Sequence, residues 1–280
     1  MLRIITDGAA DLPESWVKQY DIQVIPVNIQ FGEKTYLQFI DLDNEGFFRM
    51  VEETHKIPKT SQPTPYQFSE FYKKHAQPGD TILSIHVTSK LSGTFNSAVS
   101  AAAELQGQYN VIPFDSATGS VGIGYMCREA RIMANAGKSM EQIIARLEQL
   151  RKQCALYFTL DTLEYARMGG RVGSLTATVA ALINLKPLGQ LSDGTLDVTD
   201  KVRTRKAAID RMVQNAKDRF GMQPVYMGVL HCRDGASADL LAERVKSEFT
   251  IKELDVLEMS MSLAANFGPG TLALLLYPVE

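Results

Sequence analysis

The sequence has few cysteines and histidines, and neither type is grouped. The three cysteines, Cys127, Cys154 and Cys232, lie far apart and form no C-x-x-C pair. Neither a disulfide framework nor a zinc site is therefore predicted. The four histidines are scattered without the spacing of metal ligands. We expect reduced thiols, no bound metal or other cofactor, and a cytoplasmic protein.

Other absences exclude further classes of function. No G-x-x-x-x-G-K-[ST] loop is present, which excludes a P-loop kinase, and no G-x-S-x-G elbow is present either. A formal net charge of −3 over 280 residues argues against a general nucleic-acid-binding protein. The segment after Ile5 is too polar for a secretory signal. The longest apolar run, Thr271 to Val279, is too short for a transmembrane helix.

What is present is a chain of ordinary globular composition, 45% hydrophobic and 22% charged, with room for two domains. Up to about residue 155, strand-like segments alternate with helical segments, which predicts a mostly parallel sheet with helices on both faces. Beyond Leu156 the pattern changes to a hairpin with an Asp193-Gly194 turn and mixed elements, including a helix expected over Leu175–Leu185. We predict an α/β protein with an N-terminal three-layer α/β/α domain (1–155) and a C-terminal α+β domain with a mixed sheet (156–280).

The most informative stretch runs from Thr81 to Leu105. An apolar strand is followed by the polar loop Ser89–Thr94 and then by an Ala-rich helix. The first N–H groups of a helix lack partners, and the helix dipole favours negative charge there, so this loop is suited to an anion. Ser92 and Thr94 add hydroxyl donors, and Gly93 lets the backbone approach a ligand. The alternative interpretation is that Ser92 or Thr94 only caps the helix.

A second polar loop precedes the next helix upstream, within Lys59–Pro65. Thr64, followed by a proline and by Gln67 three residues later, predicts a capping box. The box accounts for Thr64 but leaves Thr60 and Ser61 unexplained in an extended loop before a proline. These two hydroxyls are therefore further candidates for ligand binding.

A serine hydrolase is the alternative of a different class. Ser92 as nucleophile could combine with His86 or His231 and with Asp115. Asp7, Asp115 and the Ser89–Thr94 loop are all expected at carboxyl ends of strands, where such sheets bind ligands. The signal is weak, since His86 lies inside an apolar strand and is more simply explained as a hydrogen-bonded core histidine.

Two basic segments lie in the second half of the chain. Arg167 and Arg171 flank a glycine-rich loop, and Arg203, Arg205 and Lys206 stand close together further on. Either segment could contact a phosphate or an acidic partner. The alternative is an ordinary solvated surface.

Six motifs stand in the order that is found in the DegV family. They are Lys59-Thr-Ser-Gln-Pro-Thr-Pro65, Leu91-Ser-Gly-Thr-Phe-Asn-Ser-Ala98, Asp115-Ser116, Arg167-x-Gly-Gly-Arg171, Lys201-Val-Arg-Thr-Arg-Lys206 and Gly268-Pro-Gly270. The opening Ile4–Asp7 and Asp11-Leu-Pro13 fit as well, so the match covers the whole chain. The sequence thus resembles the DegV family of bacterial fatty-acid-binding proteins, some of which are the acyl-carrying subunit of a fatty-acid kinase.

The resemblance implies a lipid-binding protein without turnover of its own. One long-chain fatty acid, such as palmitate, stearate or oleate, would lie in a tunnel between the two domains, with the loop near 56–66 reaching the second domain. A partner kinase would phosphorylate the presented carboxylate for phospholipid synthesis. The implied ligand-binding residues are Thr60, Ser61, Ser92, Gly93, Thr94, Asn266 and Gly268, and the implied partner-binding residues are Arg167, Arg171, Arg203 and Arg205. The family often has a histidine where this chain has Asn266, which can donate a hydrogen bond but cannot carry charge.

Overall fold

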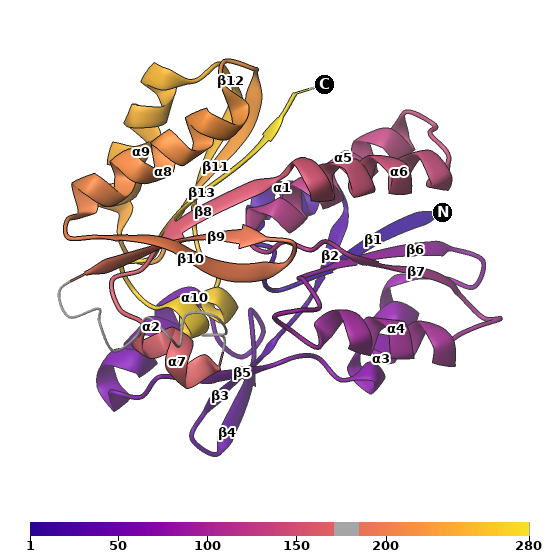
Figure 1. Ribbon diagram of the computed structural model, residues 1–280. Helices are drawn as coiled ribbons and strands as arrows, with labels where there is room; N and C mark the ends of the chain where they lie inside the picture. Colours follow the sequence, from indigo (N-terminus) through magenta and orange to yellow (C-terminus); the bar gives the residue numbers. More distant parts are fainter. Residues whose placement is uncertain (171–184, 280) are drawn as a thin grey trace. The chain divides into compact units, whose positions relative to one another are not determined.

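The computed structural model describes residues 1–170 and 185–279 (Figure 1). Two compact units are distinguished: Met1–Lys152 with Ser260–Ser262, and Gln153–Met259 with Leu263–Glu280. The expected domain boundary at residue 155 stays a prediction. The helix expected from Leu175 onward lies outside the described residues.

The first unit is built on a parallel sheet of four strands. In spatial order these are β2 (Ile22–Ile25), β1 (Leu2–Asp7), β6 (Thr81–His86) and β7 (Asn110–Asp115). Two layers of helices cover it: α3 (Pro65–His75) and α4 (Thr94–Glu104) on one face, α5 (Val121–Asn135) and α6 (Met140–Gln153) on the other (Figure 1). Because both faces are covered, the central strands carry apolar side chains almost throughout; Ile4, Ile5, Ile82 and Leu83 are all fully buried. The predicted three-layer α/β/α arrangement is confirmed.

A small antiparallel sheet is also part of this unit. Its strands, in order, are β4 (Lys34–Leu37), β3 (Asn28–Phe31) and β5 (Lys59–Ser61). The expectation of an unpaired loop at Lys59–Ser61 was wrong, since these residues pair with β3 and place Thr60 opposite the buried Ile29. The extended backbone that a following proline favours is equally compatible with a strand. The remaining helices of the unit are α1 (Glu14–Gln19) and α2 (Asn44–Thr54).

The second unit contains a mixed sheet of six strands. In spatial order these are β10 (Thr195–Val202), β9 (Lys186–Ser192), β8 (Ala155–Thr159), β13 (Leu272–Pro278), β11 (Val225–His231) and β12 (Ile251–Glu258). Only the β11–β12 pair among them is parallel, which confirms the predicted mixed sheet.

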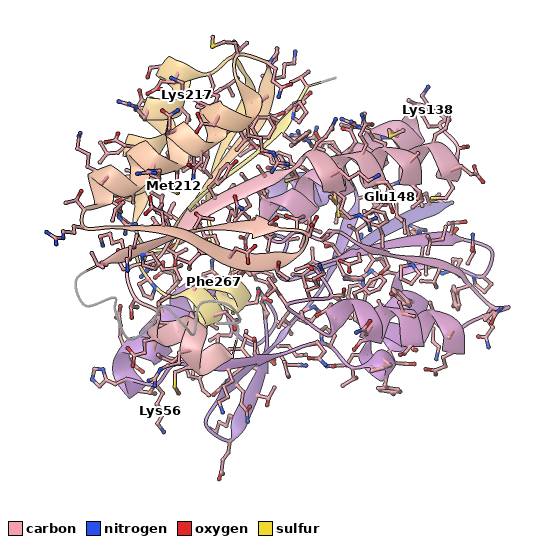
Figure 2. All side chains as sticks on the ribbon, viewed as in Figure 1. Lys56, Lys138, Glu148, Met212, Lys217 and Phe267 are labelled. Carbon is pink, nitrogen blue, oxygen red and sulfur yellow. The ribbon has the colours of Figure 1, made fainter. Side chains whose placement is uncertain are left out.

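Helices α8 (Arg205–Phe220) and α9 (Gly235–Glu248) pack on this sheet through one buried apolar cluster. Met212 of α8 (Figure 2), Leu241 of α9 and Leu274 of β13 belong to it, and all three are buried. The short helix α7 (Glu164–Gly169) also belongs to this unit, and α10 (Met261–Phe267) belongs to it from Leu263 onward. Helix α10 was not predicted.

Candidate functional site: the loop between β6 and α4

The Ser89–Thr94 loop follows β6 at the point where the strand order of the first sheet reverses. Strand β1 pairs with β2 on one side and with β6 on the other, and β7 lies beyond β6. In open parallel sheets, ligands bind outside the carboxyl ends of the strands at such a reversal. Asp7 and Asp115 are the last residues of β1 and β7, as predicted. The loop therefore stands where the fold favours a ligand.

The first half of the loop is held by its own backbone and by a neighbouring strand end. Leu91 N and Ser92 N each donate to the carbonyl of Thr88 at 3.2 Å. The Asp115 carboxylate accepts from Ser89 N, with both oxygens at 3.3 Å. Because Thr88 itself is buried, the loop enters α4 from a fixed position.

The two hydroxyls of the loop converge at the start of α4. Ser92 Oγ and Thr94 Oγ1 lie 2.8 Å apart, and Thr94 N donates to Ser92 Oγ at 3.3 Å. The N-cap residue is Gly93, and α4 has no side-chain cap hydrogen bond within the described structure. Neither Ser92 nor Thr94 is thus the N-cap residue, but Ser92 Oγ accepts from the first N–H of the helix, so the capping interpretation holds in part. The hydroxyl pair stands beside the first N–H groups of the helix, where an anion is favoured.

The second polar loop contacts the first one. A Cβ atom built on Gly93 would come within 2.7 Å of Gln62 Nε2, so the Gln62 amide already lies against the Gly93 backbone. The preceding Thr60 is half-buried and Ser61 is exposed. Successive side chains of a strand point to opposite faces, so one ligand group can meet only one of these two hydroxyls. The choice between Thr60 and Ser61 stays open, but both lie within two residues of Gln62.

The position of Gln62 is fixed by the start of α3. Thr64 and Gln67 form the predicted capping box, with Thr64 N to Gln67 Oε1 at 2.8 Å and Gln67 N to Thr64 Oγ1 at 3.1 Å. Gln67 Nε2 also donates to Asn28 Oδ1 at 3.3 Å, and Asn28 Nδ2 donates to the Gln62 carbonyl at 3.2 Å. This short chain of hydrogen bonds ties the loop to β3.

A buried polar chain runs behind the site. His86 Nδ1 lies 2.9 Å from Asp7 Oδ2, His86 Nε2 lies 2.6 Å from Ser84 Oγ, and Ser84 Oγ lies 2.8 Å from the Tyr72 hydroxyl. All four side chains are fully buried. Burial raises the pKa of Tyr72 well above its usual value, so Tyr72 stays neutral and can donate to Ser84. The prediction of a hydrogen-bonded core histidine is confirmed.

The same contacts engage His86 and Asp115, two of the residues that the hydrolase alternative would use beside Ser92. His86 is engaged by Asp7 and Ser84, and Asp115 is engaged by the backbone of Ser89 and, at 2.9 Å, of Ala117. Ser92 has Thr94, not a histidine, as its side-chain partner. His231, the other candidate base, belongs to the second unit.

Asp11 was given no role by the sequence, although it belongs to one of the quoted motifs. It adopts a left-handed backbone with φ +44° and is buried. Its carboxylate accepts from Ser120 Oγ at 2.6 Å and from Ser260 N at 2.7 Å. Burial is the main reason that the pKa of Asp11 is raised to about 6, and its hydrogen bonds oppose the rise. Asp11 thereby holds Ser260, which is far away in sequence, to the first unit.

Asn266 lies in the last turn of α10, Gly268 follows that helix directly, and both are closely packed within the second unit. A Cβ atom on Gly169 would come within 2.5 Å of Asn266 Oδ1. Gly268 has φ +77°, and a Cβ there would meet the Tyr165 ring at 2.5 Å. Its N–H donates to the Ala264 carbonyl at 2.8 Å. Glycine at 268 is thus required by backbone conformation and by close packing, and a ligand contact there stays a prediction.

The four predicted partner-binding arginines differ in their surroundings. Arg167 and Arg203 are exposed. Arg205 is only 18% exposed and forms an ion pair with Asp161 at 2.7 Å. Arg171 lies outside the described residues.

Two other kinds of feature are absent from the described part of the chain. Residues 1–170 and 185–279 hold no group of three or more His, Cys, Asp or Glu side chains that could bind a metal ion. Over the same ranges, no helix combines the length and the apolarity needed to cross a bilayer.

Comparison with known proteins relates this geometry to one family. The family described as "Uncharacterised protein, DegV family" matches residues 1–279. Protein DegV of Bacillus subtilis is 30% identical over 275 residues, covering 98% of each chain. The solved structure of a fatty-acid-binding DegV family protein of Thermus thermophilus is similar at a TM-score of 0.90 and 29% identity, covering 99% of each chain. The structure of DegV of Bacillus subtilis, described as a fatty-acid-binding protein, has a TM-score of 0.86 at 28% identity, again covering 99% of each chain. The chain belongs to the DegV family.

Proposed function

We propose that this protein binds one long-chain fatty acid and holds its carboxylate at the Ser92–Thr94 loop. The observation that carries the proposal is the hydroxyl pair, 2.8 Å apart, at the start of α4, whose N-cap residue is a glycine. The relatives from Thermus thermophilus and Bacillus subtilis, which are described as fatty-acid-binding, support the same ligand class. Palmitate, stearate and oleate are the expected ligands, and the protein performs no turnover of its own.

The chemistry of the loop matches a carboxylate. Each oxygen can accept from a hydroxyl and from a helix N–H group, and hydrogen bonds to a charged group contribute about 1.5–3 kcal/mol each. Burying a tail of about sixteen carbons contributes about 0.8 kcal/mol per methylene, or on the order of 10 kcal/mol before the costs of binding. The tail therefore dominates affinity, and the loop fixes the position of the carboxylate. The hydroxyl of Thr60 or Ser61 would complete this set of donors.

The proposal extends to the tail of the fatty acid and to a partner kinase. The tail would occupy a tunnel between the domains, with Asn266 and Gly268 near the ligand, and a partner kinase in the cytoplasm would phosphorylate the carboxylate. Arg167 and Arg203 are candidates for binding that kinase, because both are exposed cations. Charge reversal at Arg167 and Arg203 should abolish binding of the partner while oleate binding persists. Loss of both would indicate misfolding instead of a docking surface.

The proposed ligand can be identified first without any mutation. Native mass spectrometry of the protein purified from cells, followed by denaturation and lipid analysis, should show one fatty acid per chain. An empty protein that also takes up no added oleate or palmitate would refute the proposal.

The role of the loop is tested by Ser92→Ala. Loss of one hydrogen bond to a carboxylate should weaken oleate binding by about tenfold or more, with the fold intact. Ser100→Ala is the matched control, because Ser100 lies exposed on the same helix and donates to the Asn96 carbonyl. Wild-type oleate affinity in Ser92→Ala would show that Ser92 is not the anchor.

A further inference from the structure

Arg205 joins three segments that end at the same edge of the second sheet. Strands β8, β13 and β11 are neighbours, and Thr159, Leu272 and His231 stand in register at that edge. Asp161 follows β8, Asp234 follows β11, and Gly270 precedes β13.

The guanidinium group contacts all three of these residues. Arg205 Nη2 donates to Asp161 Oδ1 at 2.7 Å and to the Gly270 carbonyl at 2.6 Å, and it lies 3.0 Å from Asp234 Oδ2. Its position in helix α8 does not explain this arrangement. Arg205 follows the cap residue Thr204 directly, and a cation in the first turn opposes the helix dipole. The two carboxylates and the carbonyl offset that cost.

The backbone of Gly270, whose carbonyl accepts from Arg205, is tightly constrained. It has φ +78°, and a Cβ there would come within 2.4 Å of Asp161 Oδ2. Its N–H donates to the Cys232 carbonyl at 2.8 Å, and its carbonyl accepts from Arg205. Both polar groups of the Gly270 backbone are therefore satisfied by the surrounding unit.

The constraint extends from Gly270 back to Asn266 through the loop itself. Thr271 Oγ1 lies 3.0 Å from the Phe267 carbonyl and 2.7 Å from the Gly268 carbonyl. Three residues separate Gly270 from Asn266, which lies at the end of α10 and is packed against Gly169, so we expect a shift at Gly270 to reach Asn266.

We propose that Arg205 is a positioning residue for Asn266–Gly270, the end of α10 and the loop that follows it. Arg205 supports fatty-acid binding because it holds this segment in place, and it does not act by docking a partner protein. The inference rests on the proposed function, in which Asn266 lies near the ligand. It assigns different roles to two arginines that stand two positions apart in one motif: Arg203 is exposed, and Arg205 is part of the structure that holds the loop.

Arg205→Met tests the inference, with Arg203→Met as the matched control that removes the same charge from an exposed site. Hydrogen exchange of the full-length protein would be followed by mass spectrometry, and oleate affinity would be measured by titration. In Arg205→Met, we expect faster exchange confined to peptides covering residues 266–272 and oleate binding at least tenfold weaker. Arg203→Met should match wild type in both measurements.

Either of two results would overturn the inference: unchanged exchange at residues 266–272 in Arg205→Met, or a loosened loop with oleate affinity equal to wild type. If Arg205→Met does not fold, Arg205→Lys takes its place. Lysine keeps the charge but offers a point contact instead of a fork, so exchange of the loop should still rise, and wild-type exchange would contradict the inference. If wild-type protein binds no fatty acid, the proposed function fails, and loop exchange alone decides whether Arg205 holds the loop.

Discussion

Replacing Asp11 by asparagine should make the first unit more stable at neutral pH. The Asp11 carboxylate is buried and accepts two short hydrogen bonds, from Ser120 Oγ and Ser260 N. Asparagine is isosteric. Its Oδ1 can accept from Ser260 N, and its Nδ2 can donate to the Ser120 hydroxyl, which can rotate to accept. The substitution therefore removes a buried charge while keeping both contacts.

The magnitude follows from the pKa of Asp11, which burial raises from 3.8 to about 6 in the folded protein. Because the folded state binds this proton more tightly than the unfolded state, the free energy of unfolding falls as pH rises through this interval. A shift of about two pKa units corresponds to about 3 kcal/mol, fully present as a penalty above pH 6 and relieved below pH 3.8. Asp11→Asn removes this pH dependence. The difference in stability between variant and wild type should therefore grow by about 2–3 kcal/mol from pH 4 to pH 7.

The assay is urea denaturation followed by tryptophan fluorescence. The chain has one tryptophan, Trp16, which is buried in the first unit, so its signal reports unfolding of that unit. Asp193→Asn is the control, because Asp193 carries the same charge on the exposed turn between β9 and β10. The difference in free energy of unfolding between Asp193→Asn and wild type should stay constant over the same pH range. If the free energies of unfolding of Asp11→Asn and wild type change in parallel from pH 4 to pH 7, burial does not raise the pKa of Asp11 as described.

Three further substitutions test the packing around the two loops and the buried polar chain. Gly93→Ala places a methyl group against the flexible Gln62 amide without backbone strain, so stability should stay within about 0.5 kcal/mol of wild type in urea titrations while oleate binding weakens. His86→Phe removes the side-chain partner of the buried Asp7 carboxylate and leaves it only the backbone N–H groups of Ala9 and Val87, so it should cost about 3 kcal/mol by the same measurement; a loss below about 1 kcal/mol would contradict the role assigned to the pair. Gly270→Ala combines a positive φ with a close contact and should lower stability by about 1–3 kcal/mol in thermal unfolding, whereas an unchanged midpoint would contradict the packing described for this loop.

Local patterns in the sequence predicted the elements whose cause is local. The apolar, β-branched run at Thr81–His86 predicted a buried strand, and the Thr64–Gln67 spacing predicted the capping box that the structure contains. Strand β5 was missed because its three residues pair with β3, some thirty residues upstream, and no local pattern indicates such a pairing. The short helix α10 was likewise not predicted.

The distinction between local and long-range causes applies to the candidate site as well. Ser92 and Thr94 are two residues apart, so their proximity follows from the sequence. Arg205 appeared as one more cation in a basic motif, because its partner Asp161 lies 44 residues away and only the register of the sheet brings the two together. The charge on a side chain can be predicted from sequence, but whether that charge is already paired depends on long-range contacts.

Only part of a fatty-acid site can be predicted from a sequence. The carboxylate needs a few donors in a fixed arrangement, whereas the tail needs apolar lining of the same composition as an ordinary core. The Ser92–Thr94 loop would therefore contribute to every fatty acid equally, and the choice among palmitate, stearate and oleate would reside in the lining. It follows that Ser92→Ala should weaken the binding of all three by the same factor and leave their order of affinity unchanged in competition titrations. A changed order would place Ser92 against the tail instead of the carboxylate, and the proposed orientation of the ligand would have to be reversed.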